Sequence, residues 1–248
     1  MNASEPVFAY SASDALHANQ VIVMAMASLS EMRESDTESH IVRVQGYVQA
    51  LTDHMRTLPA FESVLTDDFC KTLSRSVPAY DLGTIAIPDR ILLKPGRLTP
   101  AEITIMRTHT TLGHAAIVRA EKTLGKTTPL LEIAKEITLS HQEKWDGSGY
   151  PQGIFGDQIP LSARIVALAD VYDALITSKV YKVGMSHEAA VGVISSERGA
   201  HFDPDVVDAF IHVKETFAEI AKRHADTDED MQQKIEYLAN AIAEIAEL

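Results

Sequence analysis

Histidine and aspartate side chains recur on the apolar faces of helices that the sequence predicts. Four such positions fall on four separate helices: His40, His109, His141 and Asp170. Asp81 lies in a short connecting segment between two of these helices. Burying an unpaired imidazole or carboxylate costs free energy. Each histidine alone has an ordinary interpretation as a hydrogen-bonded core residue. Taken together, the five residues indicate a shared metal ion, which removes that cost.

The composition of this set predicts which metals it would bind. Neutral imidazoles and ionised carboxylates without any thiolate suit Fe, Mn, Ni or Zn, as one or two divalent ions. A single bridging aspartate can hold two ions. Such a centre activates a water molecule and holds the oxygens of a phosphodiester during an in-line displacement. The residue types therefore favour metal-assisted hydrolysis.

Helical periodicity predicts the elements that must position these side chains. A helix is expected from about Ser13 to about Arg33, and the next one carries His40 on its apolar face. Thr99-Pro100-Ala101-Glu102 forms a capping box with proline at the first helical position. Other expected sets of buried residues are Val44, Tyr47 and Leu51; Ile105, Leu112 and Ala116 beside His109; Ile133 and Ile137 before His141; and Val206, Val207, Phe210 and Ile211.

The chain of 248 residues reads as all-α, because helix formers outnumber alternating β-branched residues almost throughout. We expect an N-terminal arm at 1–14, a helical domain at 15–225 and a C-terminal helical extension at 226–248. Five apolar residues of the extension are spaced by fours and threes: Met231, Ile235, Leu238, Ile242 and Ile245. This seam either packs on the chain's own domain or forms a homodimer contact.

Net charge and composition exclude several classes of partner. The formal net charge is −13, which disfavours duplex nucleic acid and anionic membranes, although a small anion can still bind where cations and a metal converge. The single cysteine, Cys70, cannot form an internal disulfide and fits a reducing compartment. The first residues lack a basic region, and the apolar run at 21–27 is too short to span a bilayer. We expect a cytoplasmic protein.

The longest motif follows His141 and reads His-Gln-Glu-Lys-Trp-Asp-Gly-Ser-Gly-Tyr-Pro, ending at Pro151. It continues with Gly153, Gly156, Ile159-Pro160, Ala163-Arg164-Ile165, Ala169-Asp170 and Asp173-Ala174-Leu175. The segment from Ile87 to Gly96, and then His187-Glu188-Ala189 and His201-Phe202-Asp203-Pro204, belong to the same pattern. Over residues 15–215 the chain resembles the HD-GYP family. A motif of this length is very specific.

This resemblance implies an all-α HD-superfamily fold with a centre of two or three metals. It also implies a bacterial signalling protein of the cyclic di-GMP phosphodiesterases, which give pGpG or GMP. The implied metal ligands are His40, Asp81, His109, His141 and Asp170, with Asp36 for a third ion; Asp81 and Asp170 are also the catalytic carboxylates. Lys179 and Lys182 would contact substrate phosphates. The Gly149-Tyr150-Pro151 loop would form the lip of the pocket and a surface for a protein partner such as a diguanylate cyclase-type domain.

Three residues depart from the family's pattern. Its His-Asp pair reads Tyr80-Asp81 here, its Gly-Lys reads Gly83-Thr84, and its His-His-Glu reads His141-Gln142-Glu143. Two metal ligands and one phosphate-binding cation are therefore replaced. Tyr80 would either bind a ferric ion as a phenolate or fill the vacated volume with its ring and hydroxyl.

Three hypotheses follow. The first is a degenerate HD-GYP protein that binds cyclic di-GMP at a partial metal site, with weak or absent hydrolysis. The alternative is an active metal-dependent cyclic di-GMP phosphodiesterase. The third is an unrelated helical scaffold whose histidines are plain core residues.

Overall fold

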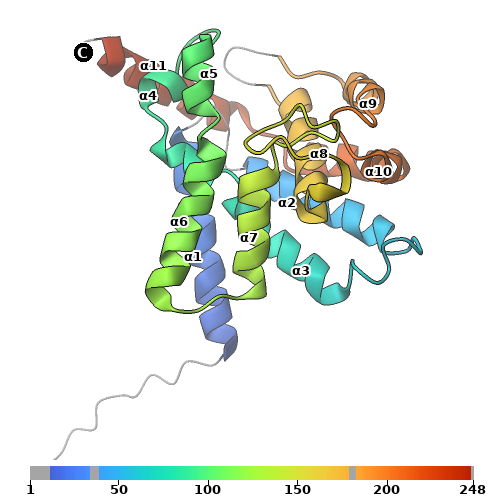
Figure 1. Cartoon of the computed structure of the whole chain (residues 1–248). Helices are drawn as coiled ribbons and strands as arrows, with labels where there is room; N and C mark the ends of the chain where they lie inside the picture. Colours follow the sequence, from blue (N-terminus) through green and yellow to red (C-terminus); the bar gives the residue numbers. More distant parts are fainter. Residues whose placement is uncertain (1–11, 34–38, 179–182, 247–248) are drawn as a thin grey trace, which may run out of the picture.

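The computed structural model describes residues 12–33, 39–178 and 183–246, which fold into helices without any β-strand (Figure 1). The predicted all-α class is therefore confirmed. None of the helices in this described part combines the length and apolar character that crossing a bilayer requires. The α-helices are α1 (Ala12–Arg33), α2 (Ser39–Met55), α3 (Asp67–Ser76), α4 (Asp89–Leu92), α5 (Pro100–Met106), α6 (His109–Leu124), α7 (Pro129–Ser140), α8 (Leu161–Ile176), α9 (His187–Ser196), α10 (Pro204–Arg223) and α11 (Asp228–Ala246).

Helix α2 lies at the centre of the core, packed against α8 and α10. Its predicted apolar face is confirmed, because Val44, Tyr47 and Leu51 are fully buried. The Tyr47 ring stacks on Phe217 of α10 at 4.4 Å and meets the edge of Tyr172 of α8 at 5.1 Å. Close aromatic pairs of this kind add to the apolar burial that holds the three helices together.

A second group of helices packs beside this core, with α6 and α7 side by side (Figure 1). The short 3-10 helix η2 (Leu82–Ala86) lies against α6. Gly83 makes this approach possible, because a Cβ there would lie 1.8 Å from the carbonyl oxygen of His109. The absence of a side chain at Gly83 thus brings the start of η2 onto the first turn of α6.

The capping box at Thr99 is confirmed, but the helix that it starts is shorter than the sequence predicts. Helix α5 ends at Met106, and α6 begins at His109 after a break of two residues. The predicted common face is wrong, because Ile105 is 38 % exposed, Leu112 is 41 % exposed and Ala116 is exposed as well. His109 is nevertheless buried. On α10 the prediction for Ile211 is also wrong, since it is 37 % exposed.

The C-terminal helix α11 contacts the chain's own domain. Lys234 Nζ donates to the carbonyl oxygen of Glu31 at 2.6 Å, and Leu238 is buried. Ile235 of the predicted seam is 41 % exposed, while the side chains of Ile242 and Ile245 lie outside the described residues. These contacts support packing on the same chain. A homodimer through this helix stays a prediction.

Candidate metal centre

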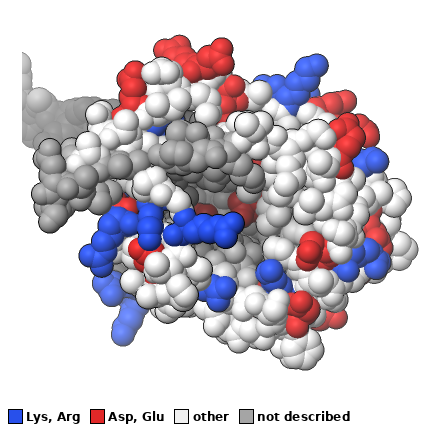
Figure 2. Space-filling view, turned by 90° about the horizontal axis from the view of Figure 1, so that it is seen from above, with Lys and Arg blue, Asp and Glu red and all other residues white. Residues whose placement is uncertain are grey.

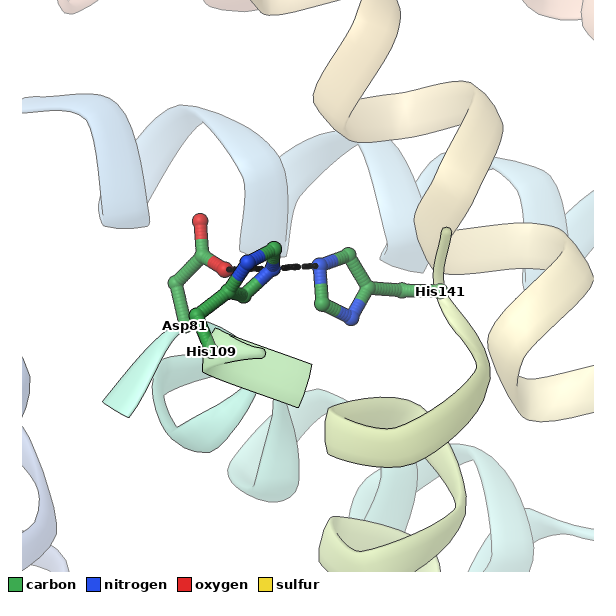
Figure 3. A group of neighbouring side chains, drawn as sticks. All are labelled: Asp81, His109 and His141. Carbon is green, nitrogen blue, oxygen red and sulfur yellow. Dashed lines mark hydrogen bonds and ion pairs between the residues drawn. The ribbon is translucent and has the colours of Figure 1, made fainter. Parts of the chain in front are cut away.

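Asp81, His109 and His141 converge from three different elements (Figure 3). Asp81 precedes η2, His109 opens α6, and His141 directly follows α7. Asp81 Oδ1 lies 3.3 Å from Nε2 of His109 and 3.3 Å from Nε2 of His141, and the two Nε2 atoms are 3.4 Å apart. One ligand atom from each residue lies within 4.8 Å of the others. We call these three residues the Asp81 cluster.

The hydrogen bonds of the Asp81 cluster fit a divalent cation. His109 Nδ1 donates to the carbonyl oxygen of Met106 at 2.8 Å, and His141 Nδ1 donates to that of Ile137 at 2.9 Å. Each neutral ring therefore directs the lone pair of Nε2 towards Asp81, an orientation typical of metal-binding histidines. Asp81 Oδ1 is buried and accepts no hydrogen bond from the described residues. Three electron-pair donors thus face one another without a proton donor, an arrangement that a cation satisfies.

The charge state of Asp81 also suits a metal ligand. Burial by itself raises the pKa of this carboxyl, but the positive charge that His141 and His109 carry when they are protonated outweighs it and lowers the pKa to about 2. The carboxylate is therefore ionised at neutral pH, as metal coordination requires.

His40 and Asp170 meet beside the Asp81 cluster, but they are joined there by Tyr80. The Tyr80 hydroxyl donates to Asp170 Oδ1 at 2.8 Å and shares a hydrogen bond with His40 Nε2 at 2.6 Å. His40 Nε2 and Asp170 Oδ1 themselves are 3.7 Å apart. Tyr80 is 3 % exposed, and its ring meets the ring of His141 edge-on at 5.1 Å. The residue that replaces the family's histidine is thus part of the interior of the site.

Asp173 fixes His40 from the other side of the ring. His40 Nδ1 donates to Asp173 Oδ2 at 2.8 Å, and Arg43 donates to both oxygens of Asp173 at 2.7 and 2.8 Å. Burial raises the pKa of Asp173, but the hydrogen bonds from His40 and Arg43 outweigh it and hold the pKa well below its usual range. Sequence reasoning missed both partners. Helical spacing could have indicated them, because Arg43 lies one turn after His40, and Asp173 lies one turn after Asp170.

The predicted lip loop is anchored by Glu143. Its side chain is 2 % exposed and accepts the backbone N–H groups of Gln152 at 2.7 Å and Gly153 at 3.1 Å. Gly149 contributes a close backbone approach, because a Cβ there would lie 2.3 Å from the nitrogen of Lys144. The loop places the Tyr150 ring 6.1 Å from that of His109, so the lip borders the Asp81 cluster. Glu143 was not among the predicted site residues.

Two further residues, Thr84 and Arg107, determine where a positive charge lies near the site. Thr84 is buried, and its hydroxyl donates to the carbonyl oxygen of Asp81 at 2.9 Å while sharing a hydrogen bond with Ser30 at 2.6 Å. It therefore joins α1 to η2 and brings no cation. Arg107, which sequence reasoning missed, is exposed and holds its guanidinium 4.8 Å above the Tyr150 ring. Arg107 places a positive charge at the lip.

Figure 2 shows a hollow in the face of the molecule that lies uppermost in Figure 1, with basic side chains along one rim and acidic atoms at its floor. Helix α5, which ends next to Arg107, lies on this face. Gln142 contributes its backbone carbonyl, which accepts from the Tyr150 N–H at 3.1 Å. The predicted residues Asp36, Lys179 and Lys182 lie outside the described residues.

Comparison with known proteins identifies relatives for most of the chain. The HD domain family matches residues 38–206. A protein of Vibrio cholerae named a probable cyclic di-GMP phosphodiesterase is 50 % identical over 210 residues, which is 85 % of this chain and 48 % of that protein. A second protein of the same organism, named a cyclic di-GMP phosphodiesterase, is 47 % identical over 206 residues, which is 83 % of this chain and 42 % of that protein.

The chain spans about half the length of these curated relatives or less. Among solved structures, a cyclic GMP-AMP-specific phosphodiesterase of Vibrio cholerae superposes with a TM-score of 0.53 at 18 % identity, over 90 % of this chain and 59 % of that one. At that identity the likeness concerns the fold alone. It agrees with the helical arrangement that positions the Asp81 cluster.

Proposed function

Because the chain belongs to the HD domain family, in its HD-GYP branch, we propose that it is a metal-dependent phosphodiesterase that opens cyclic di-GMP. The observation that carries this proposal is the Asp81 cluster, where two oriented imidazoles face an ionised carboxylate whose buried oxygen accepts no hydrogen bond from the described residues. The names of the relatives support hydrolysis better than binding alone.

The described residues suit this reaction in distinct ways. When a divalent ion is bound, the chemistry that it supplies is polarisation of a phosphoryl oxygen and a lower pKa for water. His109, His141 and Asp81 would hold it. Arg107 would neutralise a non-bridging phosphate oxygen at the lip. The anchored backbone around Gly149 would keep the lip in place while substrate binds.

A second candidate function is a cyclic di-GMP-binding protein with weak or absent hydrolysis. One observation favours it: the Tyr80 hydroxyl lies between His40 and Asp170, where the family places a metal ligand. A protein partner at the Gly149–Pro151 lip, a homodimer through residues 226–248 and the domain limits 15–225 are also proposals.

Hydrolysis of cyclic di-GMP by the purified, Mn²⁺-loaded chain tests the proposal. We expect pGpG or GMP to form, and we expect a His141→Ala variant to form neither, because one of three ligands is lost. A parallel reaction with 3′3′-cGAMP distinguishes the two cyclic dinucleotides in the relatives' names. Saturable binding of cyclic di-GMP without any product would replace the phosphodiesterase by the second candidate.

A further inference from the structure

The structure assigns the hydroxyl of Tyr80 to the place of one of the two ions that the HD-GYP resemblance implies, so that the centre of this chain binds a single ion, at the Asp81 cluster. The inference rests on the proposed metal centre. It concerns the number of ions and which residues hold them, and it can be tested without measuring hydrolysis.

The first observation concerns the distances between the Tyr80 hydroxyl, His40 and Asp170. His40 Nε2 and Asp170 Oδ1 are 3.7 Å apart, a separation that two ligands of one ion can have, given metal–ligand distances of about 2.0–2.2 Å. The Tyr80 oxygen lies 2.6 Å from the first atom and 2.8 Å from the second, so it bridges the two by hydrogen bonds. The hydroxyl therefore bonds to the two atoms that an ion at this position would need as ligands. An ion could bind them only after both hydrogen bonds were broken.

The Tyr80 ring is held in the packed interior, which makes this occupancy stable. It is 3 % exposed, belongs to the main hydrophobic core and meets the rings of both His40 and His141. Removing the hydroxyl from these hydrogen bonds would require the whole ring to move, and a close-packed core accommodates such a change poorly. A solvent-exposed tyrosine could simply rotate away.

Hydrogen bonding distinguishes the two parts of the centre, which are the Asp81 cluster and the pair of His40 and Asp170. The Tyr80 hydroxyl donates to Asp170 and accepts from Nε2–H of His40, and Asp173 binds the other nitrogen of His40, so these side chains are paired without a cation. At the Asp81 cluster no described donor faces Asp81 Oδ1. Of these two parts, the Asp81 cluster is therefore the one with a buried acceptor that a cation would satisfy.

Counting ions in the whole chain tests this inference. The protein is loaded with Mn²⁺, freed of excess metal and analysed for manganese per chain by mass spectrometry, with electron paramagnetic resonance to distinguish an isolated ion from a coupled pair. We expect one isolated ion per chain. Tyr80→His should give two ions and the signal of a coupled pair, whereas Tyr237→His, at an exposed tyrosine of α11, should leave the count at one.

Two further variants keep the test decisive if Tyr80→His fails to fold. Asp170→Asn in the otherwise unchanged chain should retain the ion, since Asp170 binds Tyr80, and His109→Ala should lose it. Two ions in the unchanged chain, or loss of its ion in Asp170→Asn, would overturn the inference, as would an unchanged count in folded Tyr80→His. If the unchanged chain binds none and Tyr80→His gains one, the assignment of Tyr80 stands and the proposed phosphodiesterase fails.

Discussion

Gly83 is in backbone contact with His109: a Cβ on Gly83 would lie 1.8 Å from the His109 carbonyl oxygen and 2.7 Å from the nitrogen of Gly113. This contact seats η2 on the first turns of α6. Asp81, two residues before Gly83, is thereby placed with its carboxylate 3.3 Å from the His109 ring. The separation of two metal-binding side chains thus depends on a residue that has no side chain.

Gly83→Ala is expected to weaken both the fold and the metal centre. The added methyl meets backbone atoms that cannot rotate away, and overpacking of this kind costs roughly 1–3 kcal/mol. The melting temperature should fall by about 2–4 °C for each kcal/mol in a chain of this length, and Mn²⁺ affinity measured by calorimetry should fall with it. Gly192→Ala in α9 is the control, because its Cβ would have no neighbour within 4 Å. Equal Mn²⁺ affinity in the two variants would contradict the role of Gly83.

Glu143→Gln should loosen the lip loop, because a glutamine offers one acceptor oxygen to two backbone N–H groups and turns its own N–H₂ towards one of them. A buried donor left without an acceptor costs about 1–3 kcal/mol. Hydrogen exchange at Gln152 and Gly153 should therefore accelerate, while exchange in α2 stays slow. Glu132→Gln, at an exposed position of α7, is the matched control. Unchanged protection of both amides would show that Glu143 does not anchor the loop.

Arg107→Ala should lower the affinity for cyclic di-GMP. A charge-assisted hydrogen bond to phosphate contributes about 1.5–3 kcal/mol, which corresponds to a loss of roughly ten- to a hundredfold. Added salt should weaken binding less in the variant than in the unchanged chain. Arg119→Ala, on α6 beside a groove that does not include the Asp81 cluster, should bind normally. Equal affinities for Arg107→Ala and Arg119→Ala would exclude a phosphate contact by Arg107.

Asp173→Asn should destabilise the fold at neutral pH, because it leaves the buried Arg43 guanidinium without its ionised partner, at a cost of about 3–5 kcal/mol. The pKa of Asp173 is lower in the folded chain than in the unfolded one, so the ionised carboxylate contributes stability above its unfolded pKa. That contribution disappears as the pH falls through the folded pKa.

The difference in melting temperature between the unchanged chain and Asp173→Asn should therefore be constant near neutral pH and shrink below a pH of about 4. Asp208→Asn removes a half-exposed ion pair with Arg198 and should change stability little at any pH. A difference that grows as the pH falls would contradict the assigned ionisation of Asp173.

The sequence predicted the apolar face that contains His40, and the structure shows Val44, Tyr47 and Leu51 buried beside it. It did not predict the break between α5 and α6, because Arg107 and Thr108 carry no glycine or proline to mark it. Ile105 and Leu112 were therefore assigned to the wrong face. The spacing of apolar residues does not show which face of a helix will pack on distant elements of the chain.

The candidate site was predicted in part for the same reason. Asp81, His109 and His141 come together, as the residue types indicated. His40 and Asp170 are instead hydrogen-bonded to Tyr80. Arg43, on a different helix from Asp173, bonds to that carboxylate in turn. Spacing along one helix places Arg43 near His40, but only the packing of α2 on α8 shows that both meet Asp173.

The most direct test of the central claim measures Mn²⁺ content and product formation on one sample of the unchanged chain, beside His109→Ala. We expect bound manganese and conversion of cyclic di-GMP to pGpG or GMP in the unchanged chain, and the loss of both in the variant. Product formation without bound metal, or equal manganese in the two samples, would contradict a metal centre built on Asp81, His109 and His141.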